Sequence, residues 1–170
     1  MTKAVWSTVK TAAAVVLFSA FATEAAAQNT ATGALNVTVN VAGRATLTLG
    51  AAGITFNDAD PDTTATLTSS GLNVTVKART GSTSNVTLTV LANGDLTAGA
   101  GVNIPISSLS WSTASAGFVN GAGNQTTAQS VGSWTGPGAR TGTLVFSLPN
   151  SWTYATGTYT ATLNYTLSVP

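Results

Sequence analysis

The chain of 170 residues has no cysteine and no histidine, and only 6% of its residues are charged. Its single glutamate is Glu24, close to the N-terminus. Without these residue types the chain cannot form a cysteine–histidine nucleophile, a serine–histidine–aspartate triad or an ordinary zinc site. It cannot form a disulfide either, so its fold must be stabilised by backbone hydrogen bonds and apolar packing. We therefore expect a protein that is not an enzyme.

Charge of either sign is too sparse beyond residue 27 to form a broad binding face. The charged residues there are Arg44, Lys77, Arg79 and Arg140 against Asp58, Asp60, Asp62 and Asp95. A protein that binds nucleic acid or anionic lipid usually has a basic stripe, so neither partner is expected. The abundance of Thr, Ser, Asn and Gly is instead typical of an assembled or extracellular structural protein.

The N-terminus has the pattern of an export signal. Lys3 and Lys10 precede the apolar run 12–22, and small residues at 25–27 provide a cleavage site. The run is too short for a membrane helix, which needs roughly 20 apolar residues. We expect cleavage after Ala27 and one exported domain over residues 28–170, located in the periplasm, on the cell surface or outside the cell and not inserted in a membrane.

Apolar and polar residues alternate through much of the remaining sequence. In 34–41, Leu35, Val37, Val39 and Val41 share one face, and the same period of two recurs in 72–78 and 85–92. Further strands are predicted at 45–49, 53–56, 64–68, 104–111, 141–148 and 157–169. Residues 112–140 are predicted to be a long glycine-rich loop with a short strand at 128–134. Turn residues separate these segments, which predicts an all-β, immunoglobulin-like antiparallel sandwich of about 7–10 strands.

The last predicted strand has the longest apolar face. Alternate residues from Tyr159 to Val169 are apolar, and polar residues stand between them. An exposed apolar edge of this length would promote aggregation. This strand is therefore expected in the interior of a sheet.

Three of the acidic residues lie together in NDADPD, residues 57–62. Asp58, Asp60 and Asp62 have the i, i+2, i+4 spacing of calcium-binding loops, so calcium is a candidate cofactor. However, no glycine follows Asp62, and Pro61 stiffens the segment. The alternative is a turn in which the Asn and Asp side chains accept hydrogen bonds from nearby backbone amides.

Three tryptophans follow the leader. Trp111 shares its phase with Leu109, which predicts a core position. Trp134 and Trp152 lie beside predicted loops, where they are candidates for stacking on sugar rings. The sequence leaves this use and a packing role both open.

The order of segments resembles that of exported pilin-like β-sandwiches of bacteria, namely spore coat protein U and the archaic chaperone–usher fimbrial subunits. The resemblance consists of the leader, ALNVTVNV, ITFNDADP, TVKARTG and the final GTYTATLNYTLSV. The ending also resembles WxL cell-surface domains, with Tyr165 at the position of their tryptophan. The resemblance implies a structural or adhesive subunit at the cell surface.

The fimbrial resemblance also implies assembly by strand exchange, in which an N-terminal segment completes the sandwich of the next subunit. The donor would lie within residues 28–41, with Leu35, Val37, Val39 and Val41 as the inserting face. Its partners would be other surface subunits and a periplasmic chaperone. Alternatively, residues 28–41 form the first strand of their own domain. A module that binds carbohydrate or cell wall is the alternative function.

Overall fold

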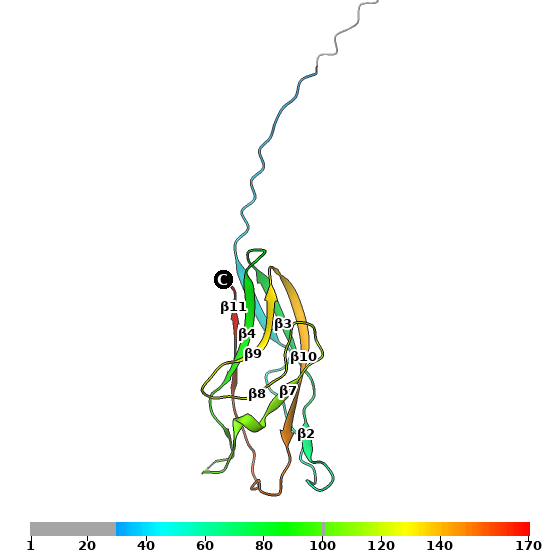
Figure 1. The fold of residues 1–170 in the computed structure, drawn as a ribbon, viewed down its shortest axis with the longest axis vertical. Helices are drawn as coiled ribbons and strands as arrows, with labels where there is room; N and C mark the ends of the chain where they lie inside the picture. The colour runs from blue at the N-terminus through cyan, green and yellow to red at the C-terminus, as the bar shows by residue number, and fades with distance from the viewer. Residues whose placement is uncertain (1–29, 100) are drawn as a thin grey trace, which may run out of the picture. The chain divides into compact units, whose positions relative to one another are not determined.

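The computed structural model describes residues 30–99 and 101–170, and it is all-β, with antiparallel sheets packed as a sandwich (Figure 1). The chain divides into one unit over residues 1–38 and a second over Val39–Pro170. The expected leader, residues 1–27, lies outside the described residues. The sandwich belongs to the second unit, which therefore confirms the predicted fold class.

The larger sheet is built around two long strands. Its strands, in spatial order, are β1 (Arg44–Leu49), β3 (Leu72–Arg79), β10 (Gly138–Pro149), β7 (Ser110–Ser112) and β8 (Gly121–Ala122). The short β2 (Thr66–Thr68) pairs with the end of β10, where Pro149 faces Thr66. The twelve residues of β10 make it the longest strand described, and it links every part of this sheet.

The second sheet has three strands, with β4 (Asn85–Ala92) between β11 (Leu163–Ser168) and β9 (Gln129–Thr135). The pairing of β4 with β9 shifts between Leu88 and Thr89, an irregularity of the β-bulge kind. A further pair, β5 (Leu96–Thr97) and β6 (Asn103–Ile104), precedes the 3-10 turn η1 (Ile106–Ser108).

The core lies between the two sheets and is built by the alternation seen in the sequence. Leu72, Val74 and Val76 of β3 are buried, and so are Val86, Leu88 and Val90 of β4. Trp111 is also buried, as predicted, and its ring lies 6.3 Å from that of Phe146. The remaining core side chains are Ala92, Ile104, Ile106, Leu109, Phe118, Val131, Trp134, Leu144, Phe146 and Leu148.

Three predicted strands differ from the structure. Residues 34–41 and 53–56 form no strand, although Ile54 and Phe56 still pack against the core. The predicted strand 104–111 is interrupted because Pro105 has no backbone N–H to donate, and the turn η1 begins immediately after it. Alternation alone does not make a strand, because a strand also needs a neighbour with which to pair.

The prediction that 157–169 lies inside a sheet is wrong. The strand begins only at Leu163, and β11 is an edge of the three-stranded sheet. Before it, an isolated bridge joins Thr97 to Thr160. An apolar face that should have been covered by a neighbouring strand is therefore left at an edge.

The region predicted as a long loop, 112–140, holds more structure than expected. It contains β8 and β9, and it forms a compact aromatic contact in which the rings of Phe118 and Trp134 meet edge to face at 5.0 Å. Gly117 has a φ of +80°, and a Cβ at this position would overlap the indole of Trp134. Glycine is therefore required here for both backbone conformation and space.

Candidate functional site: an open seam between two edge strands

The two sheets meet at one side through strands that contact each other without pairing. These are β1, the edge of the larger sheet, and β11, the edge of the smaller one. We call the line between them the seam. Each edge strand has unused backbone donors and acceptors on its outer side, which is the arrangement that accepts an added strand.

The inner face of β1 is apolar but poorly covered. Its residues Leu47 and Leu49 lie opposite Val76 and Val74 of β3, so they share the core-facing side of the sheet. Val74 and Val76 are fully buried, whereas Leu47 is only half-buried and Leu49 is 38% exposed. The core is therefore complete under β3 and incomplete under β1.

The inner face of β11 shows the same defect. Leu163, Tyr165 and Leu167 lie opposite Ala92, Val90 and Leu88, all of which are buried. The three residues of β11 are only partly buried and pack against the core from one side. Burial raises the pKa of Tyr165 to about 12, so its hydroxyl is already partly removed from water. Both strands of the seam thus have apolar side chains that are incompletely buried.

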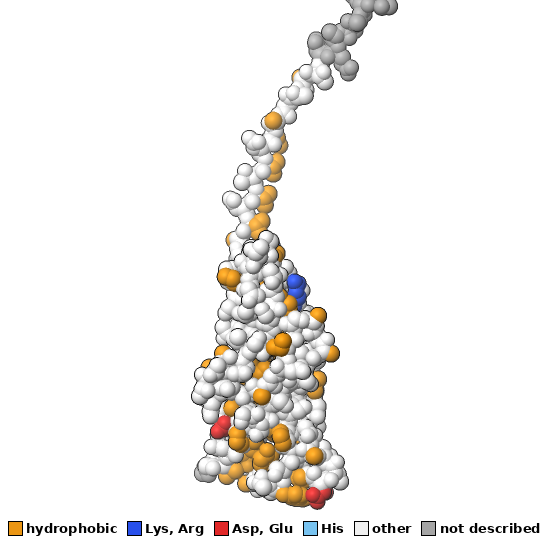
Figure 2. Space-filling view, in the orientation of Figure 1, with side chains coloured by type: hydrophobic (Ala, Val, Ile, Leu, Met, Phe, Trp, Pro, Cys, Tyr) orange, Lys and Arg blue, Asp and Glu red, His pale blue; other side chains and the backbone are white. Residues whose placement is uncertain are grey.

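The predicted inserting face lies outside any strand. Residues 30–43 have no assigned secondary structure, and the large apolar side chains of this segment are exposed: Leu35 by 88%, Val37 by 78%, Val39 by 75% and Val41 by 65%. Figure 2 shows hydrophobic side chains following one another along the segment. The alternative prediction, that residues 28–41 form the first strand of their own domain, is wrong for the described part.

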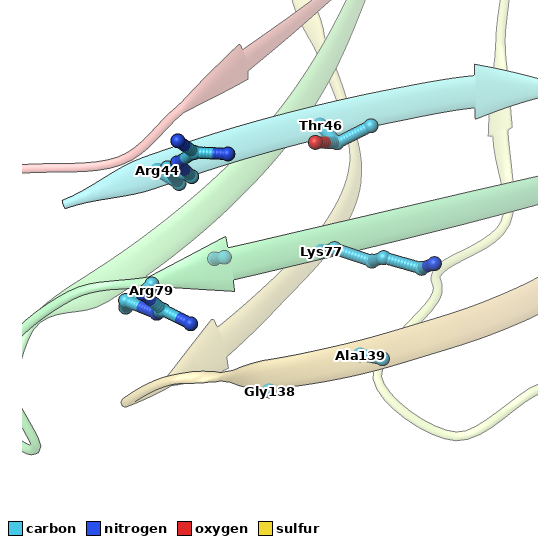
Figure 3. A pocket seen from close by; sticks show the side chains of 7 residues that line it. Arg44, Thr46, Lys77, Arg79, Gly138 and Ala139 are labelled. Atoms are coloured by element: carbon cyan, nitrogen blue, oxygen red, sulfur yellow. The ribbon is translucent and has the colours of Figure 1, made fainter. Parts of the chain in front are cut away.

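Three of the four cations beyond residue 27 gather on the outer face of the larger sheet. Arg44 of β1 lies directly opposite Arg79 of β3, and Lys77 is two residues away on the same face (Figure 3). With Thr46, Gly138 and Ala139 they line a pocket of about 320 Å³. All three cationic side chains are exposed, and we call this group the basic patch. The sequence placed Lys77 in a predicted strand and Arg44 and Arg79 in turns beside two predicted strands, but it did not show that these strands were neighbours.

The NDADPD segment forms a turn. The Oδ1 of Asp60 accepts a hydrogen bond from the backbone N–H of Asp62 at 2.9 Å, and its backbone carbonyl accepts from those of Thr63 and Thr64. Among the described residues no three acidic, cysteine or histidine side chains converge as metal ligands would. The calcium site proposed for Asp58, Asp60 and Asp62 is therefore not formed. We call these three residues the acidic turn.

The two candidate sugar-stacking residues have different surroundings. Trp134 is buried in the core, so its ring is not available to a sugar, and the prediction for this residue is corrected. Trp152 is 70% exposed, and its Nε1 donates a hydrogen bond to Oδ1 of Asp62 at 3.0 Å. Asp95, the remaining carboxylate, accepts from the backbone N–H of Ile106 and has a structural role.

Comparison with known proteins does not assign the chain to a family. No protein-family model matches it, and no curated protein matches it in sequence. None of the helical structure in the described residues is long and apolar enough to span a membrane. The seam residues were recognised from the sequence only as apolar faces of strands. Nothing in their alternation signalled that their cover was missing.

Proposed function

We propose that this protein is an exported, non-enzymatic structural subunit that assembles with other copies at the cell surface. The observation that carries the proposal is the match between an uncovered seam and an unpaired apolar segment in the same chain. Leu35, Val37, Val39 and Val41 repeat every two residues, as do the inward residues of β1 and β11. A strand inserted between β1 and β11 would pair with both edges and close the core.

Burial of the apolar side chains and ordering of the backbone nearly balance when the segment is inserted. Full burial of one Val or Leu side chain stabilises by about 1.5–3 kcal/mol, and four such side chains are available. Ordering the backbone of the segment opposes this by about 1–2 kcal/mol per residue. Insertion also completes two hydrogen-bonded ladders and covers Leu49 and its neighbours. It requires β1 and β11 to move apart, because some of their Cα atoms lie within 8 Å and a strand between them needs roughly 9–10 Å. The gain is therefore large enough only if the seam and the segment fit along their whole length.

The same reasoning supports a temporary partner before assembly. A free subunit exposes two apolar edges and an apolar segment, each of which can pair with an unrelated chain. A periplasmic chaperone that supplies a strand to the seam would prevent this. We include such a chaperone in the proposal as the expected partner during export.

Assembly of the purified protein tests the proposal. Wild-type protein should elute as a series of large species in size-exclusion chromatography and appear as filaments by electron microscopy. Val39→Asp places a charge in the middle of the inserting face and should leave only monomers. Asn40→Asp adds the same charge on the opposite face and serves as the matched control. Equal assembly of all three proteins would contradict strand insertion.

One observation favours a second candidate, binding of carbohydrate. The exposed ring of Trp152 lies beside the carboxylate of Asp62, and an aromatic plane next to a hydrogen-bond acceptor suits a sugar ring. A glycan array with wild-type protein and Trp152→Ala tests this function. Binding that persists in Trp152→Ala would exclude the site, and a protein that elutes as a clean monomer would favour this function over assembly.

A further inference from the structure

The basic patch and the acidic turn lie at opposite ends of the sandwich. The basic patch adjoins Gly138 and Ala139, where β10 begins. Immediately after β10 ends, the side-chain nitrogen of Asn150 donates to the carbonyl of Ala59, within the acidic turn, and to that of Thr64, just after it. A strand of twelve residues spans about 36 Å. On the face drawn in Figure 2, the cationic and acidic side chains are separated in the same way.

The seam runs between the same two ends. At the end of β11, the hydroxyl of Thr80 donates to the carbonyl oxygen of Pro170 at 2.6 Å, so this end lies beside Arg79 and the basic patch. The connection from β10 to β11 starts at the acidic turn, where Trp152 is bonded to Asp62. Strand β11 therefore runs from the acidic end of the sandwich toward the basic end.

Chain connectivity joins the inserting segment to the basic patch. Only Ala42 and Gly43 separate Val41 from Arg44, and three residues span at most about 10 Å. Wherever Val41 is seated on a neighbouring copy, the basic patch of its own domain must lie close by. The direction of insertion thus decides which end of the neighbour meets this patch.

The two directions have opposite electrostatic consequences. A segment antiparallel to β11 ends at Leu163, at the end of β11 that points toward the acidic turn. Strand β11 has six residues against twelve in β10, so Leu163 lies partway along the sandwich and the basic patch of one copy is directed toward the acidic turn of the next. A parallel segment brings two basic patches together, and like charges repel. Both directions allow a register in which every inserting side chain faces an apolar residue, so only the charges distinguish them. In the antiparallel register Leu35 faces Val169, Val37 faces Leu167, Val39 faces Tyr165 and Val41 faces Leu163.

We propose that the basic patch of each copy docks on the acidic turn of the next copy and fixes the direction of strand insertion. The inference rests on the proposed function. It is supported by a feature that the isolated fold does not explain, because Arg44 directly opposite Arg79 places like charges on adjacent strands, which is destabilising. The side-chain carboxylates of the described residues lie elsewhere, in the acidic turn and at Asp95. A partner with an acidic end compensates this repulsion.

Charge reversal in two complementary variants tests the contact. Variant A carries Lys77→Glu and Arg79→Glu, and variant B carries Asp58→Lys and Asp62→Lys; Asp60 is kept because it shapes the turn. Each variant alone should assemble at least about tenfold more slowly than wild type at low salt, since both ends then have the same sign. An equal mixture should recover assembly, because A and B can alternate along one filament.

Salt and location controls make the result specific. In 1 M salt, where charges are screened beyond about 3 Å, A and B should assemble at nearly the wild-type rate. Ser130→Glu with Thr135→Glu adds two negative charges, half of the net-charge change in A, on the exposed side of β9, and it should have no effect. Recovery in the mixture also excludes misfolding as the cause, because misfolded copies would not rescue each other.

The outcomes separate this contact from strand insertion itself. The docking contact would be overturned if A and B alone assembled at the wild-type rate. It would also be overturned if both variants folded but their mixture did not recover assembly. Either outcome would leave strand insertion intact. If Val39→Asp assembles normally while A and B do not, the proposed function fails and the docking contact stands without it. A protein with Lys77→Cys and a second protein with Asp58→Cys should form a disulfide with each other only when the two are mixed and assembled.

Discussion

Strands β10 and β11 have equally regular apolar faces and very different surroundings. Leu144 and Phe146 of β10 are fully buried, because β10 has strands on both sides. Leu163 and Leu167 of β11 are only partly buried, because β11 is an edge strand beside the seam. The comparison teaches that alternation in a sequence identifies an apolar strand face that must pack against other residues to be buried. Alternation does not indicate whether those packing residues belong to the same chain.

The largest difference between the two regions should appear in a pair of Leu→Ala substitutions. Leu144→Ala leaves a cavity in the closed core and should lower the free energy of unfolding by about 2–5 kcal/mol. Leu163→Ala should cost less than half as much, because its side chain is only partly buried and solvent already reaches the seam. Urea unfolding of both variants in a Val39→Asp background, which keeps the protein monomeric, measures the two values. Equal losses would mean that the seam is as closed as the core.

Gly117 tests how tightly the closed region is packed. Gly117→Ala combines a positive φ with an overlap against Trp134, and it should destabilise the protein by about 1–3 kcal/mol. Gly99→Ala is the matched control, because Gly99 has a φ of +82° and nothing within 4 Å of its added Cβ. The difference between the two melting temperatures isolates the packing contribution. No difference would show that Trp134 can move aside.

Of the aspartates in the acidic turn, only Asp60 should lower the stability of the protein appreciably when it is replaced by alanine. Asp60→Ala removes the acceptor for the N–H of Asp62 and should cost about 0.5–1.5 kcal/mol. Asp58→Ala should change stability by less than about 0.5 kcal/mol, since Asp58 is exposed. Millimolar calcium should leave the melting temperature of the wild type unchanged. A rise with calcium that is lost in Asp60→Ala would restore the metal interpretation.

Much of the fold followed from local pattern. The strands 72–78 and 85–92 were predicted almost to the residue, because both of their neighbours in the sheet come from the same chain and their alternation is satisfied in place. The predicted strand at 34–41 is absent, although its apolar and polar residues alternate as predicted. A period of two is the same in a paired strand and in a segment that has no strand beside it.

The candidate site depended on information that is not local. Arg44 and Arg79 lie far apart in the sequence, and only the pairing of β1 with β3 places them opposite each other. Trp134 and Trp152 looked alike because both flank turns, yet Gly117 makes room for Trp134 inside the core, whereas Trp152 is exposed to solvent. Sequence can name such residues, but strand order decides which of them become neighbours.

The smallest expected effect, a pH dependence, comes from a single hydroxyl in the seam. In the unfolded chain Tyr165 ionises near its ordinary pKa of 10, whereas in the folded domain burial raises the pKa to about 12. The folded state therefore favours the neutral phenol. Its contribution to stability should be complete below pH 10 and lost as the pH rises from 10 to 12. Urea unfolding at intervals across this range measures the loss, and Tyr165→Phe should reduce it.

The same titration can sharpen the comparison between the seam and the core. An inserted strand would place Val39 over Tyr165 and withdraw its hydroxyl further from water, so assembly should raise its pKa beyond the value in the monomer. Ultraviolet absorbance of tyrosinate follows ionisation directly, with Tyr165→Phe identifying the signal of this residue. Assembled wild-type protein should therefore ionise Tyr165 at a higher pH than the monomeric Val39→Asp variant. Identical titrations would mean that the assembled copies leave this part of the seam uncovered, and that another surface holds them together.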